Sequence, residues 1–166
     1  MSEHSQPIER SLIIMGVSGC GKSTVGKLLS EETGAAFFDG DDFHPAANIA
    51  KMKAGISLTD ADRQGWLETL RDLLSEHDVP IIIACSALKQ SYRDILDSGK
   101  NVPEYIYLHG SKETLLKRMQ AREHFMPASL LDSQLSTLEE PTKNCLAVSI
   151  EPPINQVITE ILSNII

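Results

Sequence analysis

The stretch GVSGCGKS, from Gly16 to Ser23, decides the fold of this chain. It satisfies the pattern GxxxxGK(S/T) and follows the apolar run SLIIM, from Ser11 to Met15, which predicts a buried strand. The segment STVGKLLSEETG then predicts a helix that begins at Ser23 and ends at Gly34. A glycine-rich turn in this position lets consecutive backbone N–H groups surround phosphate oxygens at the positive end of the helix dipole. The stretch therefore predicts a phosphate-binding loop (P-loop).

We expect every residue of the P-loop, and the residue after it, to contact a nucleotide. Lys22 is an expected catalytic residue, because its ammonium would reach the β- and γ-phosphates. The hydroxyl of Ser23 would be a ligand of Mg²⁺. The expected cofactors are therefore ATP and Mg²⁺. The expected nucleotide contacts are Gly16, Val17, Ser18, Gly19, Cys20, Gly21, Lys22, Ser23 and Thr24.

The rest of the chain alternates short apolar runs with helical patterns. Further strands are predicted at 35–38, 81–85, 105–108 and 146–150, and further helices at 49–54, 60–76, 113–122 and 154–165. Parallel strands require crossover connections, and helices supply them. We therefore predict an α/β fold of the P-loop NTPase type, with three layers in which a five-stranded parallel sheet is flanked by helices.

Composition restricts the class of protein. The 166 residues fit one domain, which we place over residues 1–166. The net charge of −8 argues against nucleic acid as a partner, because phosphate backbones demand a concentrated basic surface. The three cysteines are too few and too scattered for a disulfide scaffold, which favours a reducing compartment, and no CxxC pair indicates a zinc site. No apolar run reaches the ~18 residues of a membrane span. We expect a cytoplasmic protein that binds neither nucleic acid nor membranes.

A cluster of carboxylates, Asp39-Gly40-Asp41-Asp42, follows the second predicted strand. In an arbitrary context this pattern is more often a solvated acidic turn or the start of a helix. Here the preceding strand adjoins the P-loop, so the cluster should lie at the carboxyl edge of the sheet, where ligands bind. Asp39 is a candidate to hold a magnesium-bound water. Asp41 is a candidate catalytic residue that accepts the proton from, or orients, an attacking hydroxyl.

Six longer blocks form a more specific pattern than the P-loop alone: GVSGCGKSTVG (16–26), FFDGDDFHPAANIAKMKAG (37–55), LTDADRQGWL (58–67), ACSALKQSYRDIL (84–96), YLHGS (107–111) and RMQAREHFMPASLLDSQLSTLEEP (118–141). With these blocks the sequence resembles the gluconokinases, a family of small P-loop kinases related to shikimate kinase. The resemblance implies ATP-dependent phosphorylation of D-gluconate at its 6-hydroxyl to 6-phospho-D-gluconate, in gluconate catabolism feeding the pentose phosphate or Entner–Doudoroff routes. It also implies a homodimer and a helical lid over approximately residues 118–138.

The resemblance also implies which residues bind the sugar acid. The chemistry agrees, because a polyol carboxylate needs cations for its charge and hydrogen-bonding groups for its hydroxyls, and a planar guanidinium suits a carboxylate. The implied substrate-binding residues are Asp41, His44, Lys51, Arg63, Ser86, Lys89, Tyr92 and Arg93.

Two arginines of the implied lid lie four residues apart on a predicted helix, and therefore on one face. The resemblance places Arg118 near the nucleotide base and Arg122 near the transferring phosphate. There Arg122 would be catalytic, because it could stabilise the charge that spreads over the γ-phosphoryl oxygens. Without the resemblance, a solvated basic helix face would explain the pair about equally well.

Three other functions share part of this pattern but differ from it at specific motifs. Adenylylsulfate kinase also pairs a P-loop with DGD, but HPAANIAKM stands here in place of an arginine-rich continuation. Shikimate kinase would carry a glycine-rich loop after the third strand, where this chain has CSALK. A GTPase-like switch would carry NKxD and DxxG motifs, and the sequence shows neither.

Overall fold

A computed structural model describes residues 7–121 and 128–165 of the chain. Its sheet has five strands in the order β2-β3-β1-β4-β5, and every neighbouring pair is parallel. The predicted α/β architecture is therefore confirmed. The strands are β1 (Leu12–Met15), β2 (Phe37–Asp39), β3 (Ile82–Ala84), β4 (Glu104–His109) and β5 (Cys145–Ser149).

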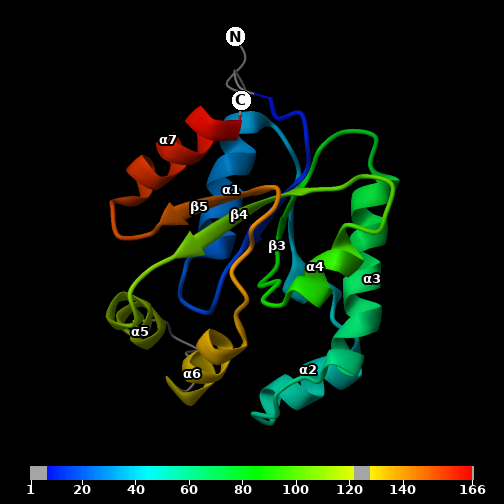
Figure 1. The fold of residues 1–166 in the computed structure, drawn as a ribbon, viewed down its shortest axis with the longest axis vertical. Helices are drawn as coiled ribbons and strands as arrows, with labels where there is room; N and C mark the ends of the chain where they lie inside the picture. The colour runs from blue at the N-terminus through cyan, green and yellow to red at the C-terminus, as the bar shows by residue number, and fades with distance from the viewer. Residues whose placement is uncertain (1–6, 122–127, 166) are drawn as a thin grey trace.

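Helices cover both faces of the sheet. Figure 1 shows α1 and α7 on one face and α3 and α4 on the other, which makes three layers. The helices are α1 (Lys22–Thr33), α2 (Ala46–Lys53), α3 (Asp60–Glu76), α4 (Gln90–Leu96), α5 (Lys112–Gln120), α6 (Ala128–Thr137) and α7 (Ile154–Ile165), with a 3₁₀ turn, η1 (Gly40–Phe43).

The core consists of two apolar clusters separated by the sheet. Successive residues of a strand point to opposite faces. In β1, accordingly, Leu12 and Ile14 join the cluster under α1 and α7, while Ile13 and Met15 join the cluster under α3 and α4. All four are at most 1% exposed, as a central strand of a parallel sheet requires. The P-loop, which follows β1, therefore starts from a fully buried strand.

The sequence located most elements, with shifts at their ends. The helix predicted at 49–54 begins earlier, as Ala46–Lys53, and the helix predicted at 113–122 ends earlier, as Lys112–Gln120. Helix α4 and the turn η1 were not predicted. Both are short, and an element of seven residues or fewer shows too few turns for its periodicity to be recognised.

The parallel arrangement brings the predicted site to one edge of the sheet. The P-loop follows the carboxyl end of β1, Asp39 ends β2, and Ser86 follows β3 by two residues. The backbone N–H of Gly16 donates to the carbonyl of Ser86 at 3.3 Å, which joins the first and third of these segments. Within the described residues, no helix combines the length and the apolar character that crossing a bilayer requires.

Candidate active site

The P-loop has the geometry of a phosphate cradle. Gly16, Gly19 and Gly21 all have positive φ angles (147°, 86° and 89°), a conformation that only glycine adopts readily. Gly21 is the N-cap of α1, and its left-handed conformation turns the chain into the helix. The ammonium of Lys22 folds back over the loop and donates to the carbonyls of Gly16 (3.0 Å) and Val17 (3.3 Å). The loop therefore stands between a strand and a helix, as the sequence predicted, while the contact of Lys22 with phosphates stays a prediction.

Two oxygen-bearing side chains meet beside the start of α1. The hydroxyl of Ser23 donates to Asp39 Oδ2 at 2.9 Å, and Asp39 Oδ1 accepts the backbone N–H of Asp41 at 3.0 Å. Magnesium is bound through hard oxygen ligands, usually one or two from the protein together with waters and substrate phosphates. A hydroxyl and a carboxylate in contact fit that pattern. Among the described residues there is no cluster of three or more His, Cys, Asp or Glu that could hold a metal alone.

Asp41 lies on η1, one residue beyond this pair. Its side chain is 79% exposed to solvent. The pKa of this carboxyl is raised, first by partial desolvation and then by the negative charge of Asp39, whereas Lys22 and His44 act in the opposite direction. A carboxylate with a raised pKa is a stronger base. The geometry therefore gives Asp41 the chemistry of a proton acceptor.

His44 is buried and held in one orientation next to Asp41. Its ring stacks on Trp66, with centroids 4.1 Å apart and an interplanar angle of 18°. Desolvation lowers the pKa of His44, so the ring is neutral at physiological pH. The amide of Asn48 lies 3.2 Å from His44 Nδ1. Because that amide nitrogen can only donate, Nδ1 accepts and the ring proton is on Nε2, which lies 3.8 Å from Asp41 Oδ1.

The cations assigned to the sugar acid are gathered where α2, α3 and α4 meet. Lys51 forms an ion pair with Asp62 at 2.7 Å. Lys89 contacts Asp60 at 3.1 Å. Each of these cations therefore already has a carboxylate partner, which a substrate carboxylate would have to share or replace.

Arg63 and Tyr92 connect the same cluster. Arg63 Nη1 donates to the Tyr92 hydroxyl at 3.0 Å and to the Leu58 carbonyl at 2.7 Å, and its guanidinium lies 5.3 Å from the Tyr92 ring centroid. The Tyr92 hydroxyl in turn donates to Asp60 at 2.6 Å. The structure therefore brings Arg63 of α3 into contact with Tyr92 of α4, 29 residues later in the sequence, while Lys51 is joined to the same helix through Asp62.

Arg93 takes a different position from these cations. It is only 2% exposed, and its guanidinium donates to the carbonyls of Ala87 (2.6 Å) and Glu139 (2.7 Å). Ala87 has a φ of 47°, the left-handed region that costs a residue with a Cβ atom about 1 kcal/mol. In the structure, Arg93 therefore faces the backbone of the loop that carries Ser86, and it holds that loop in a strained conformation.

A largely apolar hollow of about 210 Å³ adjoins the P-loop. Thr24 and Arg118 line it, together with Pro152 from the turn before α7. Arg118 Nη2 donates to the Ile150 carbonyl at 3.0 Å. Arg118, which the resemblance places near the nucleotide base, thus lines a hollow next to the P-loop. Arg122, by contrast, lies outside the described residues.

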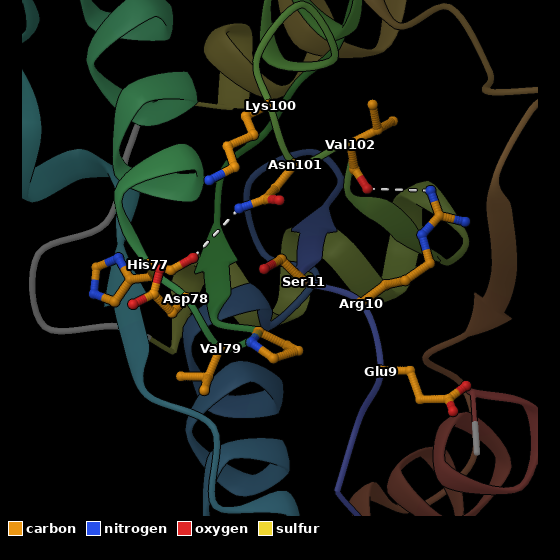
Figure 2. A pocket seen from close by; sticks show the side chains of 10 residues that line it. Glu9, Arg10, Ser11, His77, Asp78, Val79, Lys100, Asn101 and Val102 are labelled. Carbon is orange, nitrogen blue, oxygen red and sulfur yellow. Dashed lines mark hydrogen bonds between the residues drawn. The ribbon is translucent and has the colours of Figure 1, made fainter.

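A further cavity of about 340 Å³ lies at the opposite, amino edge of the sheet. Figure 2 shows Ser11, which precedes β1, and Val102, which precedes β4, among its lining residues. Arg10 spans part of it by donating to the Val102 carbonyl at 3.1 Å. The lining includes none of the predicted site residues, so we place the active site at the carboxyl edge.

Known proteins share this sequence and structure. The family model for shikimate kinase matches residues 18–162. The thermosensitive gluconokinase of Escherichia coli is 48% identical over 136 residues, which cover 79% of this chain and 72% of that protein. The chain belongs to the gluconokinase family. The gluconokinase of Gluconobacter oxydans agrees, with 47% identity over 149 residues that cover 85% of this chain and 83% of that one.

A crystal structure of a gluconokinase from Sinorhizobium meliloti superimposes with a TM-score of 0.88 at 43% identity, covering 95% of this chain and 92% of that one. Membership of the gluconokinase family confirms the resemblance seen in the sequence. It also confirms the P-loop kinase fold, since the match extends over nearly the whole chain rather than over the P-loop alone.

Several residues of the site were missed from the sequence. Asn48 fixes the tautomer of His44, Asp60 and Asp62 are partners of the cations, and Gln134 contacts the P-loop. The sequence signal for Asn48 was its spacing, four residues after His44; that it is only 3% exposed became visible in the fold. The two aspartates gave no comparable signal, because they stand in the first turn of α3, where acidic residues are expected as caps.

Proposed function

We propose that this protein transfers the γ-phosphoryl group of ATP to the 6-hydroxyl of D-gluconate, giving ADP and 6-phospho-D-gluconate. One observation carries the proposal: a P-loop with its lysine, a carboxylate with a raised pKa and a cluster of cations all meet at one edge of the sheet. The relatives named gluconokinase supply the identity of the acceptor.

The nucleotide side of the reaction is assigned to the P-loop and its neighbours. Its backbone N–H groups and Lys22 would bind the β- and γ-phosphates, and Arg118 with Thr24 would border the base. Ser23 and Asp39 would hold Mg²⁺, Ser23 directly and Asp39 through a water. When bound, this ion neutralises charge that develops on the phosphate oxygens.

The acceptor side is assigned to Asp41 and the cation cluster. Lys51, Arg63 and Lys89 would bind the carboxylate and hydroxyls of gluconate, with the Tyr92 and Ser86 hydroxyls as further hydrogen-bonding groups. His44 Nε2–H would keep the carboxylate of Asp41 in place. Asp41 would then take the proton of the attacking hydroxyl as the new P–O bond forms and the bond to ADP breaks.

The test is a coupled assay of ADP production with gluconate, idonate, shikimate and adenylylsulfate as acceptors. We expect turnover with gluconate, with the product identified by mass and by NMR as the 6-phosphate. Turnover with shikimate or adenylylsulfate but not gluconate would overturn the proposal. ATP consumption that does not depend on any acceptor would instead favour a nucleotide switch.

Three further assignments belong to the same proposal. We place the protein in the cytoplasm as a homodimer, which light scattering at micromolar concentration would test. We also propose one domain over residues 1–166, with a lid at approximately 118–138 that includes Arg122 as a catalytic residue. Arg122→Lys should lower kcat, because an ammonium lacks the planar fork of a guanidinium.

A further inference from the structure

A polar side chain interrupts the apolar face of α6. Leu131 is 0% exposed, and Leu135 and Leu138 pack against the same core cluster. Gln134 follows Leu131 by three residues and precedes Leu138 by four, so it shares their face of the helix. A carboxamide among such neighbours needs a hydrogen-bond partner, because leaving it unpaired on burial costs free energy.

The partner of Gln134 is the P-loop. Gln134 Oε1 accepts the backbone N–H of Ser18 at 2.7 Å, across 116 residues of sequence. The ammonium of Lys22 lies 3.3 Å from the carbonyl of Val17, the preceding residue of the loop. The carboxamide and the ammonium thus contact neighbouring residues of one loop. Since Lys22 is the residue that binds the terminal phosphates, Gln134 lies beside the place where those phosphates are expected.

Helix α6 is also fixed just beyond its last turn. The backbone N–H of Glu139 donates to the Leu88 carbonyl at 2.7 Å, and Glu139 Oε1 accepts the backbone N–H of Gln90 at 2.9 Å. Arg93 donates to the Glu139 carbonyl. Helix α6 is thereby held to the core at Leu131, and its end is held to the loop before α4 at Leu88 and Gln90. The backbone of Gln134 is therefore fixed relative to the P-loop.

We propose that Gln134 is a positioning residue for phosphoryl transfer. Through Oε1 it holds the P-loop at Ser18, and through Nε2 it donates to the terminal phosphate of bound ATP. A carboxamide offers both functions on one planar group. Within residues 7–121 and 128–165, Nε2 has no hydrogen-bond acceptor in the ligand-free protein, so its donors are available to a phosphate. The proposal rests on the nucleotide site proposed above.

Charge substitution tests the proximity to the terminal phosphate. Gln134→Glu keeps the size of the side chain but gives it a negative charge. That charge would repel the γ-phosphate of ATP, which ADP lacks. We expect affinity for Mg-ATP to fall roughly tenfold more than affinity for Mg-ADP, both measured by calorimetry. Ser136→Glu is the matched control, because Ser136 is exposed on α6 and points away from the apolar face. Its ratio of ATP to ADP affinity should stay at the wild-type value.

A nearly isosteric apolar variant, Gln134→Met, tests the contact with the loop while preserving the packing. In ligand-free protein labelled with ¹⁵N, the amide resonance of Ser18 should shift, and ATP affinity should fall several-fold more than ADP affinity. Equal losses for ATP and ADP in both Gln134 variants would reduce Gln134 to a packing residue and overturn the proposal, as would an unmoved Ser18 amide. Neither readout requires turnover, so failure here is distinguishable from the absence of gluconokinase activity.

Discussion

At the scale of single residues, the decisive feature is that the carboxylates of Asp39 and Asp41 lie in different surroundings. Asp39 accepts two hydrogen bonds, from the Ser23 hydroxyl and from the backbone N–H of Asp41. The Asp41 carboxyl makes no such contact with Ser23, and its pKa is raised by desolvation and by the charge of Asp39. These different surroundings fit the two proposed roles, Asp39 on the metal side and Asp41 as the base.

We predict that Asp41→Asn lowers kcat by about 10²-fold or more, because an amide does not accept the proton of the attacking hydroxyl. Affinity for Mg-ATP should change little. The base must be ionised to act, so wild-type kcat/KM should be full above the raised pKa of Asp41 and should fall as the pH drops through it, at a pH above the ordinary 3.8. Steady-state kinetics between about pH 4 and pH 8 check both points.

Asp42 provides the control for this prediction, since it is the adjacent, exposed carboxylate on η1. Asp42→Asn should keep kcat near the wild-type value and should keep the acid limb of the pH profile. Loss of the acid limb in Asp42→Asn, or its persistence with full kcat in Asp41→Asn, would contradict the assignment of Asp41.

At the scale of elements, the start of α3 determines the geometry of the cation cluster. Thr59 and Asp62 form a reciprocal capping box, and the same Asp62 carboxylate binds Lys51 of α2. These contacts lower the pKa of Asp62 to about 2, with the hydrogen bond from Lys51 as the largest cause. One carboxylate therefore both caps the start of α3 and holds Lys51, a cation that we propose binds the substrate.

We predict that this carboxylate contributes to acid stability. A carboxyl whose pKa is lowered on folding stabilises the protein above its unfolded pKa, and that contribution is lost as the pH falls through the folded value. For Asp62 the window runs from about 4 down to about 2. Asp62→Asn should therefore flatten the loss of stability in this window, as measured by urea denaturation.

Asp72→Asn is the matched control on the same helix. Asp72 is exposed, and its ion pair is with the adjacent Arg71 rather than with another helix. Its acid profile should follow the wild type. An unchanged slope for Asp62→Asn below pH 4 would instead mean that the capping box and the ion pair are not maintained in solution.

The sequence predicted elements wherever local pattern was strong, and it failed where contacts are long-range. The P-loop was recognisable because its glycines and lysine are needed at fixed spacing. Helix α4 was not, because seven residues carry little periodicity and its position depends on Arg93 reaching Glu139 across 46 residues. Gln134 offered a usable signal, a polar residue in the apolar stripe of α6, but its partner Ser18 could be found only in the fold.

At the scale of the whole molecule, the sheet separates two cores that serve the site differently. One core underlies α1 and α7, on the proposed nucleotide side, while the other underlies α3 and α4, on the proposed sugar-acid side. Arg93 is buried on the second side and holds the Ser86 loop through Ala87, whereas Ile161 is 0% exposed on α7 in the first. Stability and substrate affinity should therefore respond separately to changes in the two cores.

We predict that Ile161→Ala destabilises the protein by about 2–5 kcal/mol through loss of buried volume, and leaves the KM for gluconate near the wild-type value. Arg93→Met should also destabilise it, by about 1–3 kcal/mol for the buried carbonyl of Ala87, which loses its donor, and by less for the part-buried carbonyl of Glu139. Unlike Ile161→Ala, it should raise the KM for gluconate severalfold, because the strained Ala87 conformation would relax and move Ser86 and Lys89. Urea denaturation and steady-state kinetics on both variants separate the two effects. A wild-type KM in Arg93→Met would show that the loop holds its shape without the guanidinium. A raised gluconate KM in Ile161→Ala would contradict the separate response of the two cores.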